Sequence, residues 1–257
     1  LQKAAFPAAS VCRCIVAAYK MKQNSGMEKT ILITGASRGI GLELTRQYLT
    51  AGCFVVASCR NPGNSDELSG LKHEYRDQLE VLQLDVTSRE QLSHLDASLG
   101  SRPIDVLYCN AGVPGSKDLQ LGTLEAEQWE EVFRVNAIAP IMVAQRMLPR
   151  IRKGNDKILA FLTSQLGSIG NNSSGGMYLY RSSKAALNAA VRSLAVDLSQ
   201  EGIKVVLLHP GWVRTDMGGP NAPVSVEESV MGMRQVVKAI RQDQSGTFFN
   251  QSGEALP

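Results

Sequence analysis

In "KTILITGASRGIGLELTRQYLTAG" (29–52), a short run of β-branched residues leads through a glycine-rich loop into a segment with helical spacing. Residues 29–34 have the composition of a buried strand. Residues 39–52 carry apolar side chains at the spacing of one helix face. The stretch therefore predicts a strand that turns tightly into a helix, and the rest of the chain can be compared with this unit.

The loop "TGASRGIG" (34–41) spaces its glycines as GxxxGxG. Gly35 permits a tight turn, while Gly39 and Gly41 let the backbone approach a pyrophosphate and the helix approach the sheet. Phosphates would rest on the N-terminal amides of the helix. A plain turn is the alternative interpretation. The residues expected to hold a dinucleotide here are Gly35, Ser37, Arg38, Gly39, Ile40 and Gly41.

The same alternation of strand and helix continues to the end of the chain. Further strands are expected at 53–58, 79–86, 104–110, 157–164, 203–210 and 246–250, and further helices at 64–77, 88–99, 125–152, 178–200 and 226–241. Apolar strands that are each followed by a helix indicate a parallel sheet covered on both faces. We therefore predict an α/β fold: a single Rossmann-type doubly wound domain of about seven parallel strands, which binds ligands at their carboxyl ends.

The charge of the chain is uneven. Residues 1–26 carry four basic residues and no acid, so of the 27 basic and 24 acidic residues, 23 and 24 remain in 27–257, a net charge of −1. This balance gives no sign of a nucleic-acid surface. No stretch approaches 18 uncharged apolar residues, so no membrane span is expected.

Residues 1–26 are interpreted as an N-terminal extension (a tag, a read-through or a tail), with a transit peptide as the other alternative, and 27–257 as the single Rossmann-type domain. Of the five cysteines, three fall in or beside predicted strands, and Cys12 and Cys14 lack a second pair for zinc. The set is typical of reduced thiols in a cytoplasmic protein. The three histidines lie far apart, so no metal site is expected.

The end of the second strand distinguishes between the two nicotinamide dinucleotides. An acidic residue there would bind the ribose 2′-hydroxyl and repel a 2′-phosphate, but "VVASCRNP" (55–62) has none. Arg60 can pair with a 2′-phosphate through its planar fork, and Arg38 is a second candidate. We therefore expect NADP(H), with Arg60 as a solvated loop cation being the alternative.

The stretch "MYLYRSSKAAL" (177–187) holds two tyrosines and a lysine. Lys184 follows Tyr180 by four residues, which places both side chains on one helix face, whereas Ser182 follows Tyr178. Free tyrosine has a pKa of about 10, and a neighbouring ammonium, together with the positive ring of an oxidised nicotinamide, favours the phenolate. Tyr180 is thus the predicted proton donor, with a lowered pKa. Tyr178 is expected to line the pocket instead.

Seven motifs occur together in one order: "TGASRGIG", "LDVT" (84–87), "NAG" (110–112), Asn136 in "RVNAIAP", Ser164 in "LTSQLGS", "YRSSK" (180–184) and "PGWVRTD" (210–216). In this set the chain resembles the short-chain dehydrogenase/reductase family over essentially everything from Met27 onward. Its segments "GGMYLYRSSKAALNAA" and "LHPGWVRTDMGG" are most similar to the branch of C-factor and sniffer-type carbonyl reductases.

This resemblance implies hydride transfer between a nicotinamide and a carbonyl or alcohol carbon. Tyr180 would protonate the developing alkoxide, Ser164 would hydrogen-bond the same oxygen, and Lys184 would also hold the nicotinamide ribose. Asn136 would support a water linked to Lys184. The resemblance further assigns cofactor contacts to Asp85, Val86, Asn110, Ala111, Gly112, Tyr180, Lys184, Pro210, Gly211, Val213 and Thr215.

The catalytic serine has two candidates. The family usually places it about 13 residues before the tyrosine, whereas Ser164 lies 16 before Tyr180 and Ser168 lies 12 before. Ser164 is preferred because it directly ends the predicted strand. The extra residues then fit the loop "GSIGNNSSGGM" (167–177), which would border the substrate.

The expected substrate pocket is moderately apolar. Its candidate lining residues are Leu166, Ile169, Met177, Tyr178, Trp212 and Met217. The segment "MGGPNAPVSVEES" (217–229), rich in Gly and Pro, is a candidate lid.

These features predict an NADPH-dependent reductase of a small carbonyl compound (aldehyde, ketone or quinone). A signalling or regulatory protein that senses NADP(H) with weak turnover is the alternative, and an epimerase or dehydratase with the same Tyr and Lys is a third. The resemblance also implies a homodimer or homotetramer, paired through the helices that begin near Glu125 and Tyr178. No nucleic-acid or membrane partner is expected.

Overall fold

The computed structural model describes residues 29–116 and 119–257. The predicted N-terminal extension, 1–26, lies outside the described residues, as do Cys12 and Cys14.

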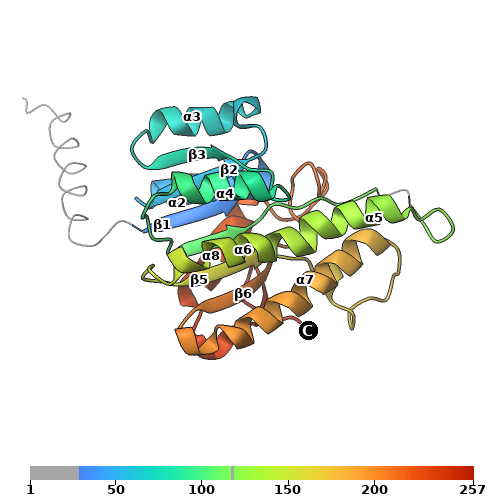
Figure 1. Ribbon diagram of the computed structural model, residues 1–257. Coiled ribbons are helices and arrows are strands. Elements are labelled where there is room, and N and C mark those ends of the chain that lie inside the picture. Colours follow the sequence, from blue (N-terminus) through green and yellow to red (C-terminus); the bar gives the residue numbers. More distant parts are fainter. Residues whose placement is uncertain (1–28, 117–118) are drawn as a thin grey trace, which may run out of the picture.

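A parallel sheet of seven strands, in the order β3-β2-β1-β4-β5-β6-β7, runs through the molecule (Figure 1). The strands are β1 (Thr30–Thr34), β2 (Phe54–Cys59), β3 (Leu79–Gln83), β4 (Val106–Cys109), β5 (Ile158–Leu162), β6 (Lys204–His209) and β7 (Phe248–Asn250). All six neighbouring pairs are parallel. The order reverses between β1 and β4, which is the switch point of a doubly wound sheet. The predicted α/β fold is confirmed.

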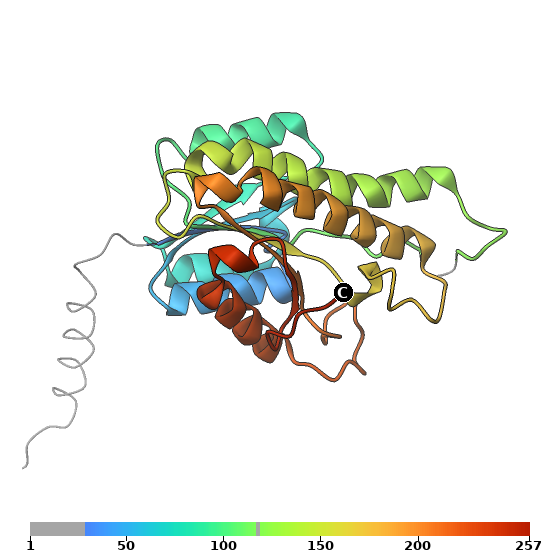
Figure 2. The same cartoon turned by 90° about the horizontal axis from the view of Figure 1, so that it is seen from below.

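Helices cover both faces of this sheet (Figures 1 and 2). They are α2 (Gly39–Thr50), α3 (Asp66–Glu74), α4 (Arg89–Ser98), α5 (Ala126–Phe133), a π-helical turn (Arg134–Ile138), α6 (Ala139–Ile151), α7 (Tyr178–Asp197) and α8 (Val226–Ala239). α2, α3 and α8 pack on one face, and α4, α6 and α7 on the other. Parallel strands need this double cover because each strand buries both of its faces.

Each face of the sheet has its own apolar core. Ile31, Ile33 and Tyr108 point toward α2 and α8, while Leu32 and Leu107 point toward α6 and α7. The alternation follows from the two-residue period of side chains along a strand. Rigid packing on both faces holds the strand ends, where the candidate site lies, in fixed positions.

One predicted helix and several predicted strand ends differ from the structure. The helix predicted over 125–152 is continuous in path but widens into the π-helical turn at its middle, where Asn136 is buried. Several predicted strands also end earlier: β3 ends at Gln83, so Asp85 lies in the loop beyond it. Apolar sequence continues past these strand ends because the loops there remain partly buried, so composition alone could not locate the last paired residue.

Within the described residues, none of the helices combines the length and the apolar character needed to cross a bilayer.

Candidate active site

A cavity of about 790 Å³ opens at the carboxyl ends of the strands. We call it the strand-end cavity. Of the predicted cofactor and catalytic residues, it is lined by Gly35, Ser37, Arg38, Gly39, Ile40, Gly41, Arg60, Asp85, Val86, Asn110, Ala111, Gly112, Tyr180, Lys184, Pro210 and Thr215. Residues from motifs that are 180 positions apart in the chain thus meet at one edge of the sheet.

The glycine loop is shaped by close backbone contacts. A Cβ at Gly41 would lie 2.2 Å from the carbonyl oxygen of Gly35, and a Cβ at Gly35 would lie 2.9 Å from Cα of Ala111. Gly35 also has a φ of +68°, which favours glycine. Asn110 Nδ2 donates to the carbonyl oxygens of Thr34 and Gly35, at 2.9 and 3.0 Å. No other residue type fits these positions without moving the backbone.

The start of α2 fits a bound phosphate. Arg38 occupies the N-cap position without a side-chain cap hydrogen bond, and the first turn contains no acidic residue. The first-turn amides and the helix dipole are therefore not capped by a side chain of the helix itself. The residues present fit the pyrophosphate of a dinucleotide.

Two polar residues stand at the ends of β2 and β3. Arg60 is exposed and lines the strand-end cavity, and no acid follows it until Asp66. Hydrogen bonds from Thr87, at 2.7 and 2.9 Å, lower the pKa of Asp85, and the nearby charge of Arg60 acts in the same direction. Asp85 is thus held as a carboxylate with its loop in a defined turn.

Lys184 is buried in the first turns of α7. Its Nζ donates to the carbonyl oxygen of Leu162 at 2.9 Å and lies 5.7 Å from the ring centroid of Tyr180. Burial lowers the pKa of Lys184 to about 8. The lysine and the tyrosine share one helix face, as the four-residue spacing predicts.

Among the protein's own groups, burial has the largest effect on the pKa of Tyr180. Burial raises its pKa, and a hydrogen bond with the Ser164 side chain opposes this effect only in part. Desolvation therefore outweighs the hydrogen bond from the serine. The lower pKa expected beside an oxidised nicotinamide stays a prediction.

The structure brings Ser164 to Tyr180. Ser164 follows β5, is 8% exposed and caps the short 3₁₀ turn Gln165–Gly167, where its hydroxyl accepts from Leu166 N at 3.2 Å. Ser168 lies beyond this turn, and its hydroxyl instead accepts from Asn171 N at 3.4 Å. Ser164, although it lies farther from Tyr180 in the sequence than Ser168, is the serine that hydrogen-bonds the tyrosine.

Asn136 lies in the π-helical turn and is fully buried. Its amide accepts from Val113 N at 2.9 Å and donates to Val113 O at 2.8 Å and to Ser183 Oγ at 3.1 Å. A Cβ at Gly112 would lie 3.2 Å from Asn136 Oδ1 and 3.7 Å from Lys184 Nζ. The asparagine therefore holds the loop after β4 against α7, close to the lysine. π-Helical turns are frequent at functional sites.

The predicted substrate lining only partly borders the strand-end cavity, so its role in binding substrate stays a prediction. Met217 lines it, whereas Leu166, Ile169, Met177, Tyr178 and Trp212 are not among its described lining residues. Ile169 is 85% exposed, and Trp212 turns back to donate from Nε1 to Gly218 O at 2.8 Å. An apolar residue in a loop can point outward, and sequence alone does not show its direction. Gly211 and Val213 also lie off the described lining.

Hydrogen bonds and a β-bridge fix the predicted lid, 217–229, to the loop that precedes it. Arg214 Nη1 donates to the carbonyl oxygens of Ala222 and Pro223, each at 3.0 Å, and Val213 forms a β-bridge with Val224. A capping box at Ser225 then starts α8. These contacts hold the segment beside the strand-end cavity.

Other residues line the strand-end cavity that sequence patterns did not single out. They include Thr87, Val113, Glu131, Arg134, Val135, Thr163, Arg214 and Asp216. Glu131, Arg134 and Val135 belong to a predicted helix in which every turn offers such residues, so no local signal marked them. Arg214 and Asp216 lie within the quoted motif "PGWVRTD" and could have been included on that ground.

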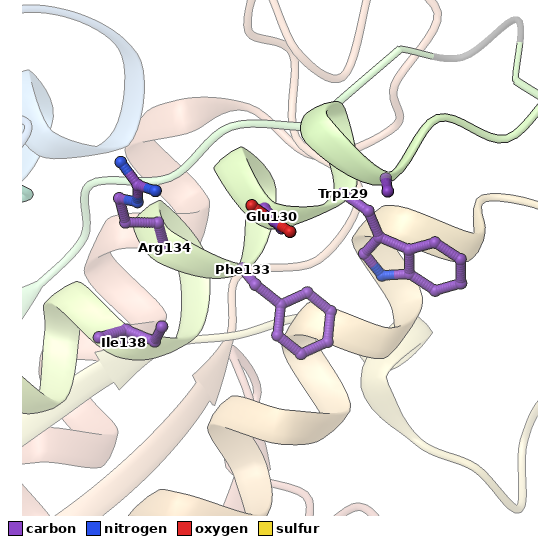
Figure 3. A pocket seen from close by; sticks show the side chains of 6 residues that line it. Trp129, Glu130, Phe133, Arg134 and Ile138 are labelled. Atoms are coloured by element: carbon purple, nitrogen blue, oxygen red, sulfur yellow. The ribbon is translucent and has the colours of Figure 1, made fainter.

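A second hollow, of about 510 Å³, lies on the outer side of α5 and the π-helical turn (Figure 3). We call it the outer groove; it is lined by Ala126, Trp129, Glu130, Phe133, Arg134 and Ile138. Trp129 Nε1 donates to Ser182 Oγ on α7 at 2.9 Å, so the groove is linked to the helix that carries Tyr180 and Lys184.

Across residues 29–116 and 119–257, no cluster of three or more His, Cys, Asp or Glu side chains could hold a metal ion.

Comparison with known proteins agrees with this geometry. The chain is 46% identical over 155 residues to the C-signal of Myxococcus xanthus, covering 60% of this chain and 93% of that protein. The carbonyl reductase Sniffer of D. melanogaster matches with a TM-score of 0.84 and 34% identity, over 89% of this chain and 99% of that one. The NADPH-bound carbonyl reductase from chicken fatty liver matches with a TM-score of 0.84 and 32% identity, over 89% and 98%.

The family model described as short chain dehydrogenase matches residues 29–224. These residues contain the glycine loop, the π-helical turn and the Tyr180–Lys184 pair, which is the whole strand-end cavity up to the lid. The chain belongs to the short chain dehydrogenase family and is an oxidoreductase of that family.

Proposed function

We propose that this oxidoreductase is an NADPH-dependent carbonyl reductase that transfers a hydride to an aldehyde, ketone or quinone, with Tyr180 as the proton donor. The observation that carries the proposal is the meeting of Tyr180, Lys184 and Ser164 beside the glycine loop at one edge of the sheet. Similarity to the NADPH-bound chicken enzyme and to Sniffer supports the choice of cofactor and reaction.

The cofactor would lie along the strand-end cavity. The N-terminus of α2 would bind its pyrophosphate, Arg60 and Arg38 its 2′-phosphate, and Asp85 with Val86 its adenine. Lys184 would hold the nicotinamide ribose. When bound, the reduced nicotinamide supplies the hydride, and its oxidised form carries the positive charge that Tyr180 otherwise lacks.

The chain's own residues would handle the proton. A carbonyl oxygen beside Tyr180 and Ser164 accepts a hydrogen bond from each hydroxyl. As the carbonyl carbon gains the hydride, the Tyr180 hydroxyl gives its proton to the developing alkoxide. The lysine ammonium and the oxidised ring then favour the phenolate, which lowers the cost that burial imposes. Asn136 holds the neighbouring loop, so that Lys184 keeps its position.

The proposal is tested with purified protein, NADPH or NADH, and a panel of quinones, aldehydes and ketones. We expect NADPH oxidation with at least one carbonyl and a loss of about 100-fold or more in kcat for Tyr180→Phe, with NADPH binding retained. Tyr75→Phe, at the end of α3 and away from the strand-end cavity, is the matched control. Tight NADPH binding without turnover of any carbonyl would instead favour a sensor.

The arginine assignment has its own test. Arg60→Ala should weaken NADPH binding much more than NADH binding, because only NADPH carries the 2′-phosphate. An unchanged preference between the two cofactors in Arg60→Ala would contradict the assignment.

We further propose that two copies of the chain pair through the outer groove. Glu130 and Arg134 lie four residues apart on its rim, with Phe133 and Ile138 among its apolar lining (Figure 3). In an antiparallel two-fold pairing, Glu130 of one copy would face Arg134 of the other, so the surface is complementary to itself. Ile138 and Met142, 55% and 45% exposed, would become buried.

A cytoplasmic location also stays a prediction.

A further inference from the structure

An ion pair joins two walls of the strand-end cavity. Arg38, in the glycine loop, places Nη1 2.9 Å from Oδ2 of Asp216, in the loop after β6. Both residues line the strand-end cavity. Their side chains are 74% and 77% exposed, so the pair stands at the solvent side of this site.

The backbone holds both partners in place without the ion pair. A Cβ at Gly39 would lie 3.3 Å from Cγ2 of Thr215, so the loop after β6 packs directly on the glycine loop. Thr215 Oγ1 also accepts from Gly218 N at 3.1 Å. On the other side, Ser65 Oγ donates to Ser37 O at 2.7 Å. The Arg38 side chain can therefore change partner while Asp216 stays within reach.

Two anions can pair with the Arg38 guanidinium: the Asp216 carboxylate and a phosphate of the proposed cofactor. A planar guanidinium pairs equally well in geometry with a carboxylate and with a phosphate. Arg38 is one of the cations that face the proposed cofactor, and its guanidinium donates to Asp216.

Building on the proposed function, we propose that Asp216 competes with a phosphate group of the dinucleotide for Arg38 and thereby keeps the cofactor exchangeable. A phosphate carries at least as much negative charge as a carboxylate, so it takes the arginine when the cofactor is bound. As the cofactor leaves, Asp216 takes the arginine back, which lowers the cost of release. Such a step matters for turnover, because release from the site rather than chemistry limits the rate of many enzymes.

The test compares cofactor binding by Asp216→Asn and the wild-type protein, using calorimetry for the dissociation constant and stopped-flow fluorescence for the release rate. Because exposed ion pairs contribute little, we expect NADPH to bind about two- to fivefold more tightly to Asp216→Asn and to leave more slowly. In an Arg38→Ala background, Asp216→Asn should have no such effect.

The matched control is Asp243→Asn. Asp243 pairs with Arg241 at 3.1 Å and is also exposed, 69% at its side chain, but neither residue lines the strand-end cavity. This variant loses the same charge and should bind NADPH as the wild-type protein does.

Comparing the binding of NADPH and NADH shows which phosphate group competes with Asp216. A gain for NADPH alone assigns the competition to the 2′-phosphate, and an equal gain for NADH assigns it to the pyrophosphate, which both cofactors carry. Unchanged or weaker binding by Asp216→Asn overturns the inference, as does a gain that persists without Arg38. Wild-type protein that binds neither cofactor would overturn the proposed function itself, whereas selective NADPH binding with no gain overturns only the role of Asp216.

Discussion

Ser164 and Ser168 lie four residues apart, on either side of a 3₁₀ turn, and their hydroxyls have different hydrogen-bond partners. Both are buried, at 8% and 5% exposure, so burial does not separate them. Their hydrogen bonds do, because Ser164 bonds to Tyr180 whereas the Ser168 hydroxyl accepts from Asn171 N. Chemistry at this site therefore depends on where the strand ends.

Substitution of each serine by alanine tests this difference. Ser164→Ala should lower kcat by about 10-fold or more, because a hydrogen bond to the developing oxyanion is lost. Ser168→Ala removes a hydroxyl of equal burial and should keep most of the activity. The assignment of Ser164 is wrong if the two variants show the opposite order in a steady-state assay.

Lys184 couples the pH to the stability of the ligand-free protein. Burial lowers its pKa to about 8, whereas the unfolded chain keeps the ordinary value near 10.5. Between these pH values the unfolded chain binds more protons, so the lysine's contribution to the free energy of unfolding rises with pH. Below about pH 8 the protein bears the full cost of the buried charge.

Removing the lysine removes this dependence. The free energy of unfolding of the wild-type protein, relative to Lys184→Met, should rise by up to about 3 kcal/mol from pH 8 to pH 10.5. Urea unfolding at several pH values, without cofactor, measures it. Lys238→Met, which removes an exposed lysine from α8, is the control and should follow the wild-type slope. Parallel curves for wild type and Lys184→Met would contradict the burial argument.

At the scale of single elements, the junction between β1 and α2 tolerates no side chain. The Cβ of an alanine at position 41 would lie 2.2 Å from Gly35 O and 2.6 Å from Asn110 Nδ2, so the loop or the helix must shift. Since the same loop presents its amides to the strand-end cavity, packing and ligand binding are affected together.

Gly41→Ala should therefore lower the free energy of unfolding by about 2 kcal/mol or more and weaken NADPH binding. Gly70→Ala in α3 is a matched control, because a Cβ there meets nothing within 4 Å. It should leave binding unchanged and raise stability by about 0.5–1 kcal/mol, the helix preference of alanine over glycine. Thermal unfolding and calorimetry give both quantities. Equal effects of the two substitutions would show that the close contact at position 41 is not important.

For the whole molecule, the outer groove and the strand-end cavity lie on two sides of the same π-helical turn. Arg134 lines both, and Trp129 connects the outer groove to α7. Pairing of two copies would therefore cover a helix that also positions Asn136. If the proposed dimer forms, its contact would thus also affect the position of Asn136 in the site.

Phe133→Asp, on the groove side of α5, should convert the proposed dimer into monomers, because it places an unpaired charge in a buried apolar contact. Sedimentation velocity at several concentrations gives the mass. Met231→Asp, which replaces a residue 53% exposed on α8, is the control and should keep the wild-type mass. A wild-type protein that is monomeric throughout would rule out the pairing.

Sequence patterns alone determined the α/β fold, the glycine loop and the shared helix face of Tyr180 and Lys184. These features rest on short-range rules: the period of a strand, the freedom of glycine and the four-residue spacing of a helix. They do not depend on what packs against them, so they could be predicted before any tertiary contact was known.

The tertiary structure decided what long-range packing controls. It left Trp212 and Ile169 outside the lining of the strand-end cavity, raised the pKa of Tyr180 through burial, and joined Arg38 to Asp216, 178 residues later in the chain. Such outcomes depend on which loop lies over which strand end and how much water it excludes. Local sequence predicts neither the position of these loops nor the burial they cause, because both depend on segments that meet only when the sheet has formed.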